Sequence, residues 1–467
     1  MAVFFFQSAA HAQDDSAEVA ALKTEVKALE ARIDQLEKRQ QASAPISGNV
    51  EKRLAVVERK QEVQQEQQQA QAASVPSVEV GPNGLSVISY DRQYSATLRG
   101  YVQADNRTFL NGGAKTGTTD TFLIRSARPI IDARMTDYFD MHFMMDFGKG
   151  QTTLLDAYGN FHPLPGNNLL NLRIGETKVP VGLERWQPEQ DVLFVERGQT
   201  TNLVPYRDIG AMLYGQMIPD QLEYYLGIMN GAADLQANTG DGDQDKDIVG
   251  RIFTHPLLWS GVHALEGLGV GVAGTYGNHQ GSVTAPGLTS GYVTPGQRVW
   301  FAYSAGTFAD GPEWRLNPQL TYYNNAFGMF AEYVANDQEV GHGAATAKLR
   351  NNAWEGVTSY VLTGEDAAFD GVKPAHNFDP KAGYWGAFEL VGRMSELSVD
   401  KKAFPAFASL TASSSRAFER TLGATWYFNQ AVKFNLDFSL TSFDGGAAAR
   451  LDHADEKAVM SRMQMKF

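Results

Sequence analysis

The sequence predicts an all-β fold, a sixteen-stranded antiparallel transmembrane β-barrel with an N-terminal α-helical coiled-coil segment. Two observations carry this prediction. Long stretches alternate strictly between apolar and polar side chains, the period of a strand with one face in lipid and the other in a wet lumen. No apolar run in the 467 residues approaches the ~18 to 20 that a membrane helix requires. The mean hydropathy of -0.30 agrees with both, because alternation hides the apolar face.

The alternation is clearest in the final eleven residues. One face carries Val459, Met463, Met465 and Phe467. Phe467 at the end also resembles the membrane-insertion signal of bacterial outer-membrane barrels. A soluble amphipathic strand would show the same local pattern, so repetition has to decide between the two interpretations. The same alternation recurs in the runs 139–147, 314–322 and 432–440.

Sixteen alternating or aromatic-rich runs lie between residues 95 and 467, and an even number places both ends of a barrel on one side of the membrane. A seventeenth candidate, 299–304, is assigned to a loop, because counting it would put the tight turn at Asn324-Asn325 on the outside. The expected external loops are 179–208, 230–246, 277–312, 337–350, 395–416 and 444–455. Sixteen strands enclose a water-filled lumen, whereas eight would be filled by side chains.

The N-terminus is interpreted as an export signal. An apolar run at 2–6 precedes Ala10-His-Ala12, the small-x-small pattern of a secretory cleavage site. No basic residue precedes the run, so segment 1–12 is expected to be a truncated signal peptide. The mature protein would then begin near Gln13, in the periplasm of a Gram-negative bacterium.

Segment 13–42 predicts a coiled-coil helix. Its seam, with residues alternately three and four apart, is Val19, Leu22, Val26, Leu29, Ile33 and Leu36. Such a seam favours parallel dimers in isolation, although a trimeric barrel could impose three strands, and a lone amphipathic helix is the alternative. Segment 43–93 reads as a Gln/Ala-rich linker that could hold a second helix, and the barrel is expected over 94–467.

Five phrases, in order along the barrel segment, resemble the phosphate-selective porin O and P family. They are FLIRSARP at 122–129, LRIGETKVPVGLE at 172–184, SYVLTGE at 359–365, FDPKAGYWGAFEL at 378–390 and GATWYFN at 423–429. The resemblance implies a trimer of sixteen-stranded barrels, each with its third external loop folded into the lumen. It also implies a constriction lined by arginines and a few lysines, with loop 179–208 as the third loop here.

Seven basic residues are therefore candidates for lining the pore and binding anions. They are Arg125, Arg128, Arg173, Lys178, Arg185, Arg197 and Arg207. Guanidinium groups can replace part of the hydration of an anion and bind phosphate oxygens in pairs, and a series of such sites lets the anion move on. The alternative is that each is an ordinary charge paired with an acid nearby in sequence, as Arg197 with Glu196 or Arg207 with Asp208. Asp146 and Asp156, on predicted lumen faces, could favour cations.

The expected function is passive diffusion of small anions, phosphate or polyphosphate, across the outer membrane. Ser126 stands where a further basic residue would be expected, and the net charge is -13, so a general or sugar porin without phosphate selectivity is the alternative. An envelope tether that binds peptidoglycan through the coiled coil is another. The other expected partners are a second and third copy of the chain, outer-membrane lipid and lipopolysaccharide, and the barrel-assembly machinery.

The sequence gives no sign of an enzyme, a cofactor, a metal site or nucleic-acid binding. The nine histidines lack metal-ligand spacing, and no nucleophile motif occurs, although an outer-membrane hydrolase could still assemble its residues from distant strands. The GxGxxG spelling at 269–274 lies inside a strand pattern and opens no helix. The acidic run 241–247 lacks the glycine and the final acid of a calcium loop.

Overall fold

The computed structural model describes residues 8–40, 52–64, 75–112, 117–237 and 244–467. The chain divides into two compact units, Met1–Val75 and Pro76–Phe467. Parts of four segments that the sequence interpretation used lie outside the described residues. They are 1–7 of the expected signal peptide, 41–42 of the expected coiled-coil helix, 43–51 and 65–74 of the expected linker, and 241–243 of the acidic run.

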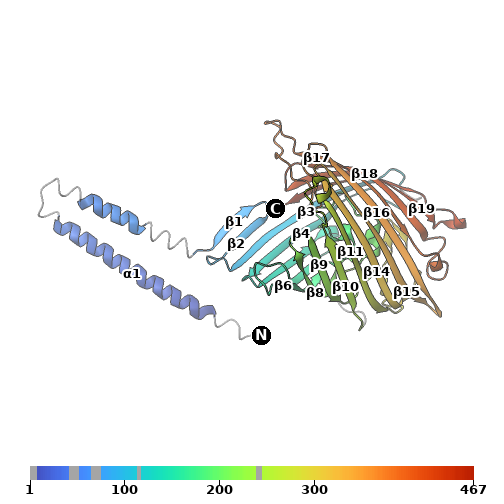
Figure 1. Ribbon diagram of the computed structural model, residues 1–467, viewed down its shortest axis with the longest axis horizontal. Coiled ribbons are helices and arrows are strands. Elements are labelled where there is room, and N and C mark those ends of the chain that lie inside the picture. Colours follow the sequence, from blue (N-terminus) through green and yellow to red (C-terminus); the bar gives the residue numbers. More distant parts are fainter. Residues whose placement is uncertain (1–7, 41–51, 65–74, 113–116, 238–243) are drawn as a thin grey trace. The chain divides into compact units, whose positions relative to one another are not determined.

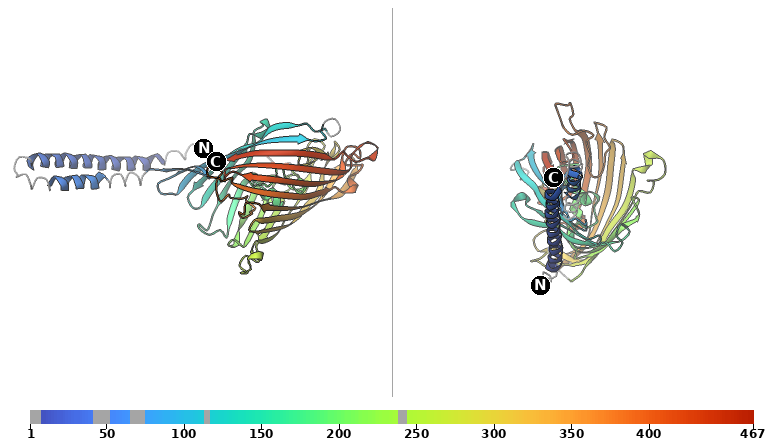
Figure 2. Two further views of the ribbon diagram at one scale, coloured as in Figure 1. Left: turned by 90° about the horizontal axis from the view of Figure 1, so that it is seen from above. Right: turned by 90° about the vertical axis from the view of Figure 1, so that its left-hand side faces the viewer.

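The first unit consists of two helices that lie side by side (Figure 2). Helix α1 spans Ser8–Gln40, so it begins inside the expected signal peptide, and a second helix covers 52–64. Lys60 Nζ lies 3.5 Å from Asp34 Oδ1, which joins the two helices. Leu29 and Leu36 of the predicted seam are 56% and 59% exposed, so a coiled coil with other copies stays a prediction. Among the described residues, no helix combines the length and apolarity needed to cross a membrane.

The second unit begins with a hairpin that the sequence analysis did not predict. Strand β1 (Ser77–Gly81) pairs with β2 (Gly84–Ile88), and β2 pairs in turn with the start of the first barrel strand, with Leu85 opposite Leu98. The segment 43–93 therefore contains a helix and a hairpin as well as linker.

Among the described residues, sixteen antiparallel strands close into a barrel (Figure 1), and all sixteen lie at the predicted runs. The strands are β3 (Tyr94–Phe109), β4 (Thr121–Met135), β5 (Phe139–Asp146), β6 (Thr153–Phe161), β7 (Asn171–Thr177), β8 (Asp208–Ile218), β9 (Leu222–Met229), β10 (Asp247–Thr254), β11 (Leu268–Gln280), β14 (Thr307–Asn324), β15 (Phe327–His342), β16 (Ala345–Val361), β17 (Ala387–Ser398), β18 (Ser414–Tyr427), β19 (Val432–Gly445) and β20 (Glu456–Lys466).

The barrel closes where β20 pairs with β3, and Arg462 of β20 donates two hydrogen bonds, at 2.7 and 2.8 Å, to Asp105 of β3. Side chains alternate across the wall as predicted, because the polar set of β19 is buried in the lumen while Leu436 and Phe438 are exposed outside. The predicted transmembrane barrel is thus confirmed in strand number, strand direction and the facing of its side chains.

One end of the barrel, here called the long-loop end, carries connections such as 178–207, 230–246, 281–306 and 399–413. The other, the short-turn end, carries tight turns such as 219–221. The candidate strand at 299–304 does lie in a loop, where β12 (Tyr292–Val293) pairs with β13 (Val299–Phe301). The prediction of a long loop at 337–350 is wrong, because β15 and β16 stay paired up to His342 and Ala345.

Three connections at the long-loop end fill part of the lumen with apolar side chains. Leu203 and Val204 belong to 178–207, Trp300 and Phe301 to 281–306, and Phe407 to 399–413, and all five are buried in one cluster. This cluster packs on the inner faces of strands from β8 to β19. The strands from β3 to β7 have a more polar inner face, which includes a small buried cluster of Tyr101, Ile130, Met144 and Leu155. Figure 2 shows the barrel from two further directions.

Short helices complete the connections. They are α3 (Leu183–Trp186), α4 (His263–Glu266), η1 (Gly148–Gly150), η2 (Gln199–Leu203), η3 (Lys401–Ala403) and η4 (Ala448–Arg450).

Candidate functional site

The connection between β7 and β8, residues 178–207, lies inside the barrel and is called the third loop here. The backbone N–H groups of Leu183 and Glu184, at the start of α3, donate to the Glu332 carboxylate of β15 at 2.6 and 3.1 Å. The N–H of Val195 donates to Asp437 of β19 at 2.6 Å. Both acceptors belong to the wall across the lumen from β7 and β8, so the third loop crosses the lumen.

Charged side chains of the far wall hold the third loop at further points. Arg393 of β17, fully buried, donates to the Glu184 carboxylate at 3.1 Å and to the Glu196 carbonyl at 3.0 Å. Lys433 of β19 donates to the Val192 carbonyl at 3.0 Å. Gly198 passes so close to Glu355 that a Cβ there would lie 2.1 Å from a carboxylate oxygen, which explains a glycine at this position. The third loop is therefore fixed by many buried polar contacts.

A cavity lies on each side of the third loop. The long-loop cavity, about 370 Å³, runs along β4 to β6 beneath the loops. The short-turn cavity, about 690 Å³, is wider and is lined by strands from β3 to β10 and by β14. Arg128 and Glu189 line both cavities, and their side chains come within 3.8 Å of each other. This pair therefore lies where the two cavities approach each other.

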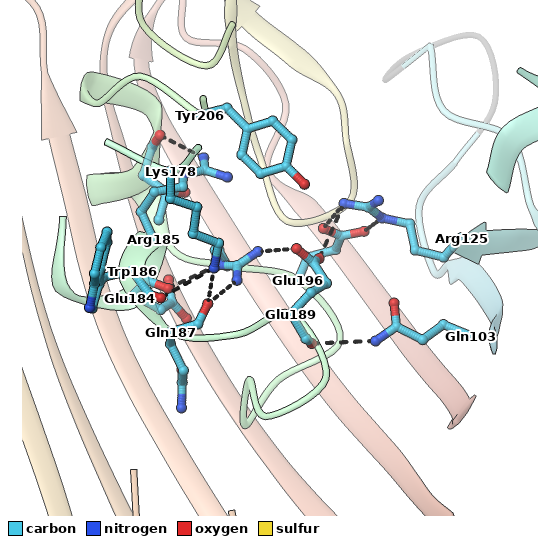
Figure 3. A network of polar contacts seen from close by, with 12 residues as sticks. Gln103, Arg125, Lys178, Glu184, Arg185, Trp186, Gln187, Glu189, Glu196 and Tyr206 are labelled. Atoms are coloured by element: carbon cyan, nitrogen blue, oxygen red, sulfur yellow. Dashed lines mark hydrogen bonds and ion pairs between the residues drawn. The ribbon is translucent and has the colours of Figure 1, made fainter. Parts of the chain in front are cut away.

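Arg125 and Arg128 of β4 are brought together with acids of the third loop and of β5. Arg125 donates to the Glu196 carboxylate at 2.6 and 3.1 Å, as Figure 3 shows. Arg128 donates to Asp146 at 2.7 Å and to the hydroxyl oxygens of two tyrosines. Both arginines line the long-loop cavity while keeping acidic partners.

Arg197 and Arg185 of the third loop differ in their partners. Arg197 donates to Glu189 at 2.5 Å, not to the neighbouring Glu196 that sequence proximity suggested. Arg185 donates to the Thr201 carbonyl at 2.8 Å, and no acid of the described residues lies within 4 Å of it. Burial and the nearby Arg197 lower the pKa of Arg185 to about 10, so the guanidinium stays charged at neutral pH.

Lys178, Arg207 and Arg173 face the short-turn cavity. Lys178 donates to the carbonyls of Trp186 and Gln187 at 3.2 and 2.8 Å (Figure 3). Arg207 forms a two-bond pair with Asp156 of β6, at 3.1 and 2.8 Å, rather than with Asp208. Arg173 donates to the side chains of Asn160 and Thr177, and its guanidinium stacks over Tyr158.

The arginines keep the two acids of the third loop ionised. Burial raises the pKa of Glu189, but Arg197, Arg128 and Arg125 together hold it well below its ordinary value. Burial likewise raises the pKa of Glu196, and Arg125 and Arg107 outweigh it, so that this pKa is also lowered. The region where the two cavities approach each other therefore holds ionised carboxylates, Glu189 and Glu196, next to charged arginines.

The sequence analysis missed Tyr206 and Lys149 as lining residues. Tyr206 accepts a hydrogen bond from Arg128 at 3.2 Å, and Arg207 and Arg185 lie over its ring at 4.2 and 5.2 Å. Lys149, in the tight connection after β5, lines the long-loop cavity. The Tyr-Arg pair at 206–207 inside the third loop was the available signal for Tyr206, because aromatic faces attract guanidinium groups.

Phe467 lies at the seam where the barrel closes. Its backbone exchanges two hydrogen bonds with Gly100 of β3, at 3.0 and 3.1 Å, and its side chain is 56% exposed. This position leaves the ring on the wall of the barrel at the short-turn end, and its role in insertion stays a prediction.

Known proteins match this chain over the barrel. A family model described as phosphate-selective porin O and P matches residues 96–467. Porin O of Pseudomonas aeruginosa is 26% identical over 384 residues, which cover 75% of this chain and 84% of that protein. Among solved structures, the outer membrane channel DcaP of Acinetobacter baumannii has a TM-score of 0.52 at 11% identity, covering 80% of this chain and 97% of that one.

The family match spans most of the chain and coincides with the sixteen strands, so the barrel, the family and the sequence resemblance agree. The protein is an outer-membrane channel and not an enzyme. The chain belongs to the phosphate-selective porin O and P family.

Proposed function

We propose that this porin conducts small anions, with phosphate-like anions among them, through a passage that the third loop narrows. The main support is the pair of cavities that meet at Arg128 and Glu189. Among the described residues that line the long-loop cavity, five are cationic and three acidic, so an entering anion meets an excess of positive charge. The family description names phosphate, and paired guanidinium groups suit its oxygens.

A general porin without phosphate selectivity is the second candidate. It is favoured by the acids that pair with the arginines, since Glu196 binds Arg125 and Asp146 binds Arg128. Such pairs leave weak local fields, which would pass many small solutes. Phosphate titration separates the two candidates, because only a site with free guanidinium hydrogens holds phosphate long enough to block the current.

We also propose a homotrimer with the short-turn end in the periplasm. Strands β5, β6 and β7 have only eight, nine and seven residues, whereas β14, β15 and β16 have eighteen, sixteen and seventeen. A tilted strand needs roughly 9 to 11 residues to span the hydrocarbon layer. A neighbouring subunit that covers the short wall would remove this mismatch. The chain enters β3 at Tyr94, at the short-turn end of the barrel.

The experiment is a reversal-potential measurement in a planar bilayer under a KCl gradient, followed by titration of inorganic phosphate. We expect anion selectivity and phosphate block in the native protein, and both reduced in Arg128→Gln. Arg350→Gln is the matched control, because Arg350 pairs with Asp337, is 63% exposed and lines neither cavity. Cation selectivity of the native protein contradicts the proposal, whereas anion selectivity without phosphate block favours the general porin.

A further inference from the structure

The short-turn cavity contains more aromatic surface than a water-filled passage needs. Its lining includes Tyr158 of β6, Trp186 of the third loop and Phe253 of β10. Porin lumens are normally polar, and lipid contact cannot explain rings that face inward. Tyr225 of β9 supports Trp186 from behind in an edge-to-face arrangement with centroids 5.0 Å apart. The rings therefore form a packed and positioned surface inside the barrel.

Arginines alternate with these rings around the wall. The Arg173 guanidinium lies 4.0 Å from the centroid of Tyr158 and 4.9 Å from that of Tyr214. The Arg251 guanidinium lies 4.8 Å from the centroid of Phe253 and 5.8 Å from that of Trp186. The guanidinium groups therefore lie over ring faces, and Tyr158 also stacks with His142 at 5.0 Å between centroids. The edge of Tyr158 and the half-buried ring of Trp186 remain as aromatic surface toward the cavity.

Arg173 differs from the other arginines of this cavity in its charge balance. Arg99, Arg128, Arg207 and Arg251 each have an acid within 4 Å. No acid of the described residues lies that close to Arg173, whose hydrogen bonds go to a neutral amide and a hydroxyl. A guanidinium held between two rings, with no carboxylate to balance it, is arranged to receive one from a solute.

We propose that the short-turn cavity binds organic anions with a flat ring, that is, aromatic carboxylates, with the carboxylate on Arg173 and the ring against Trp186 and the edge of Tyr158. The inference rests on the proposed passage of anions and names a class of them. Inorganic phosphate would gain no affinity from the aromatic rings, and a neutral sugar would leave the positive charge of Arg173 without a counter-ion. A volume of about 690 Å³ accommodates a one- or two-ring acid with water around it.

The test compares block of single-channel current by benzoate and by cyclohexanecarboxylate, which has the same charge and a similar size but no flat ring. We expect benzoate to block at a concentration roughly three- to tenfold lower, because stacking on aromatic side chains adds that much affinity. In Trp186→Leu and in Tyr158→Leu, benzoate and cyclohexanecarboxylate should block at similar concentrations. Trp259→Leu should not, because Trp259 is 66% exposed at the same end of the barrel and lines neither cavity.

Equal block by both acids in the native protein overturns the inference, as does stronger block by a neutral disaccharide. Loss of block by both acids in both lining variants overturns it too, because charge alone would then explain binding. The reversal potential in KCl, recorded on the same membranes, tests the proposed function separately. Cation selectivity would contradict the proposed function. Equal block by the two acids, together with anion selectivity, would contradict only the proposed site for aromatic rings.

Discussion

Glu189 contacts three arginines at once. It lies 2.5 Å from Arg197, 3.7 Å from Arg125 and 3.8 Å from Arg128. Because it also lines both cavities, its negative charge stands on the proposed route of the anion, and it neutralises the arginines that would attract the anion. Glu189 thus limits the affinity of these arginines for an anion. Conduction requires such weak binding, because the ion must also leave the site.

Replacing Glu189 with Gln should therefore increase the preference for anions. A unit charge about 6 Å from a permeating ion changes its energy by roughly 0.7 kcal/mol in water, about a threefold change in partitioning. We expect the chloride-to-potassium permeability ratio, measured from reversal potentials, to rise by roughly threefold or more in Glu189→Gln. Glu396→Gln is the control, because Glu396 pairs with Arg416 outside both cavities. An unchanged ratio in Glu189→Gln would place the ion route elsewhere.

All seven candidate cations line at least one of the two cavities, but their ion-pair partners could not be predicted from the sequence. The alternative interpretation paired Arg207 with Asp208 and Arg197 with Glu196. In the structure Arg207 binds Asp156 and Arg197 binds Glu189. Sequence proximity failed because successive strand residues point to opposite faces, whereas the loop and the wall bring distant residues together. Among the described residues, Arg173 and Arg185 have no acid within 4 Å, and only the fold decides which cations are left in this way.

The third loop is an element whose stability depends on buried charge. Arg393 donates to Glu419 at 2.8 and 2.6 Å and to Glu184 of the loop at 3.1 Å, and none of the three side chains is more than 1% exposed. Removing one partner of such a network leaves an uncompensated buried charge, which is more costly than losing a surface pair.

Arg393→Met should therefore destabilise the barrel and loosen the third loop. We expect a loss of about 3–5 kcal/mol in unfolding free energy, visible as a lower midpoint in urea and as noisier open-channel current. Arg416→Met is the matched control, because Arg416 is 42% exposed between Glu396 and Asp444, and such pairs contribute at most about 1 kcal/mol. Equal midpoints for the two variants would show that the network around Arg393 contributes little.

The hairpin of β15 and β16 shows where element prediction failed. The segment 337–350 is rich in polar and small residues, so it reads as a loop, yet Asp337 and Arg350 pair directly across the strands at 2.5 Å. Here the inward face is apolar, because Val340 and Leu349 belong to the buried cluster, whereas Lys348 and Arg350 on the outward face are exposed. The alternation is therefore the reverse of the one that marks a lipid-facing strand. Inside the membrane layer the two faces meet different solvents, and there the alternation located all sixteen strands.

At the scale of the molecule, the proposed passage runs along one side of the barrel. The apolar cluster of Trp300, Phe301 and Phe407 with the third loop fills the lumen next to β8–β19 at the long-loop end. The long-loop cavity remains along β4–β6, where Arg125 and Lys149 lie. Solutes should therefore follow the wall that carries the basic residues, and the apolar cluster excludes water from the rest of that half.

Single cysteines can test this off-centre route directly, because the chain has none of its own. Gln151 lines the long-loop cavity, Ser413 is 4% exposed beside the apolar cluster, and Thr411 is exposed on the loop 399–413. A negatively charged methanethiosulfonate added from the long-loop side should reduce the conductance of Gln151→Cys by narrowing the route and adding an anion to it. Thr411→Cys should be labelled, as mass spectrometry would show, without a change in current, and Ser413→Cys should resist labelling. Rapid labelling of Ser413→Cys with loss of current, beside an unaffected Gln151→Cys, would instead mean that solutes travel through the region of the cluster.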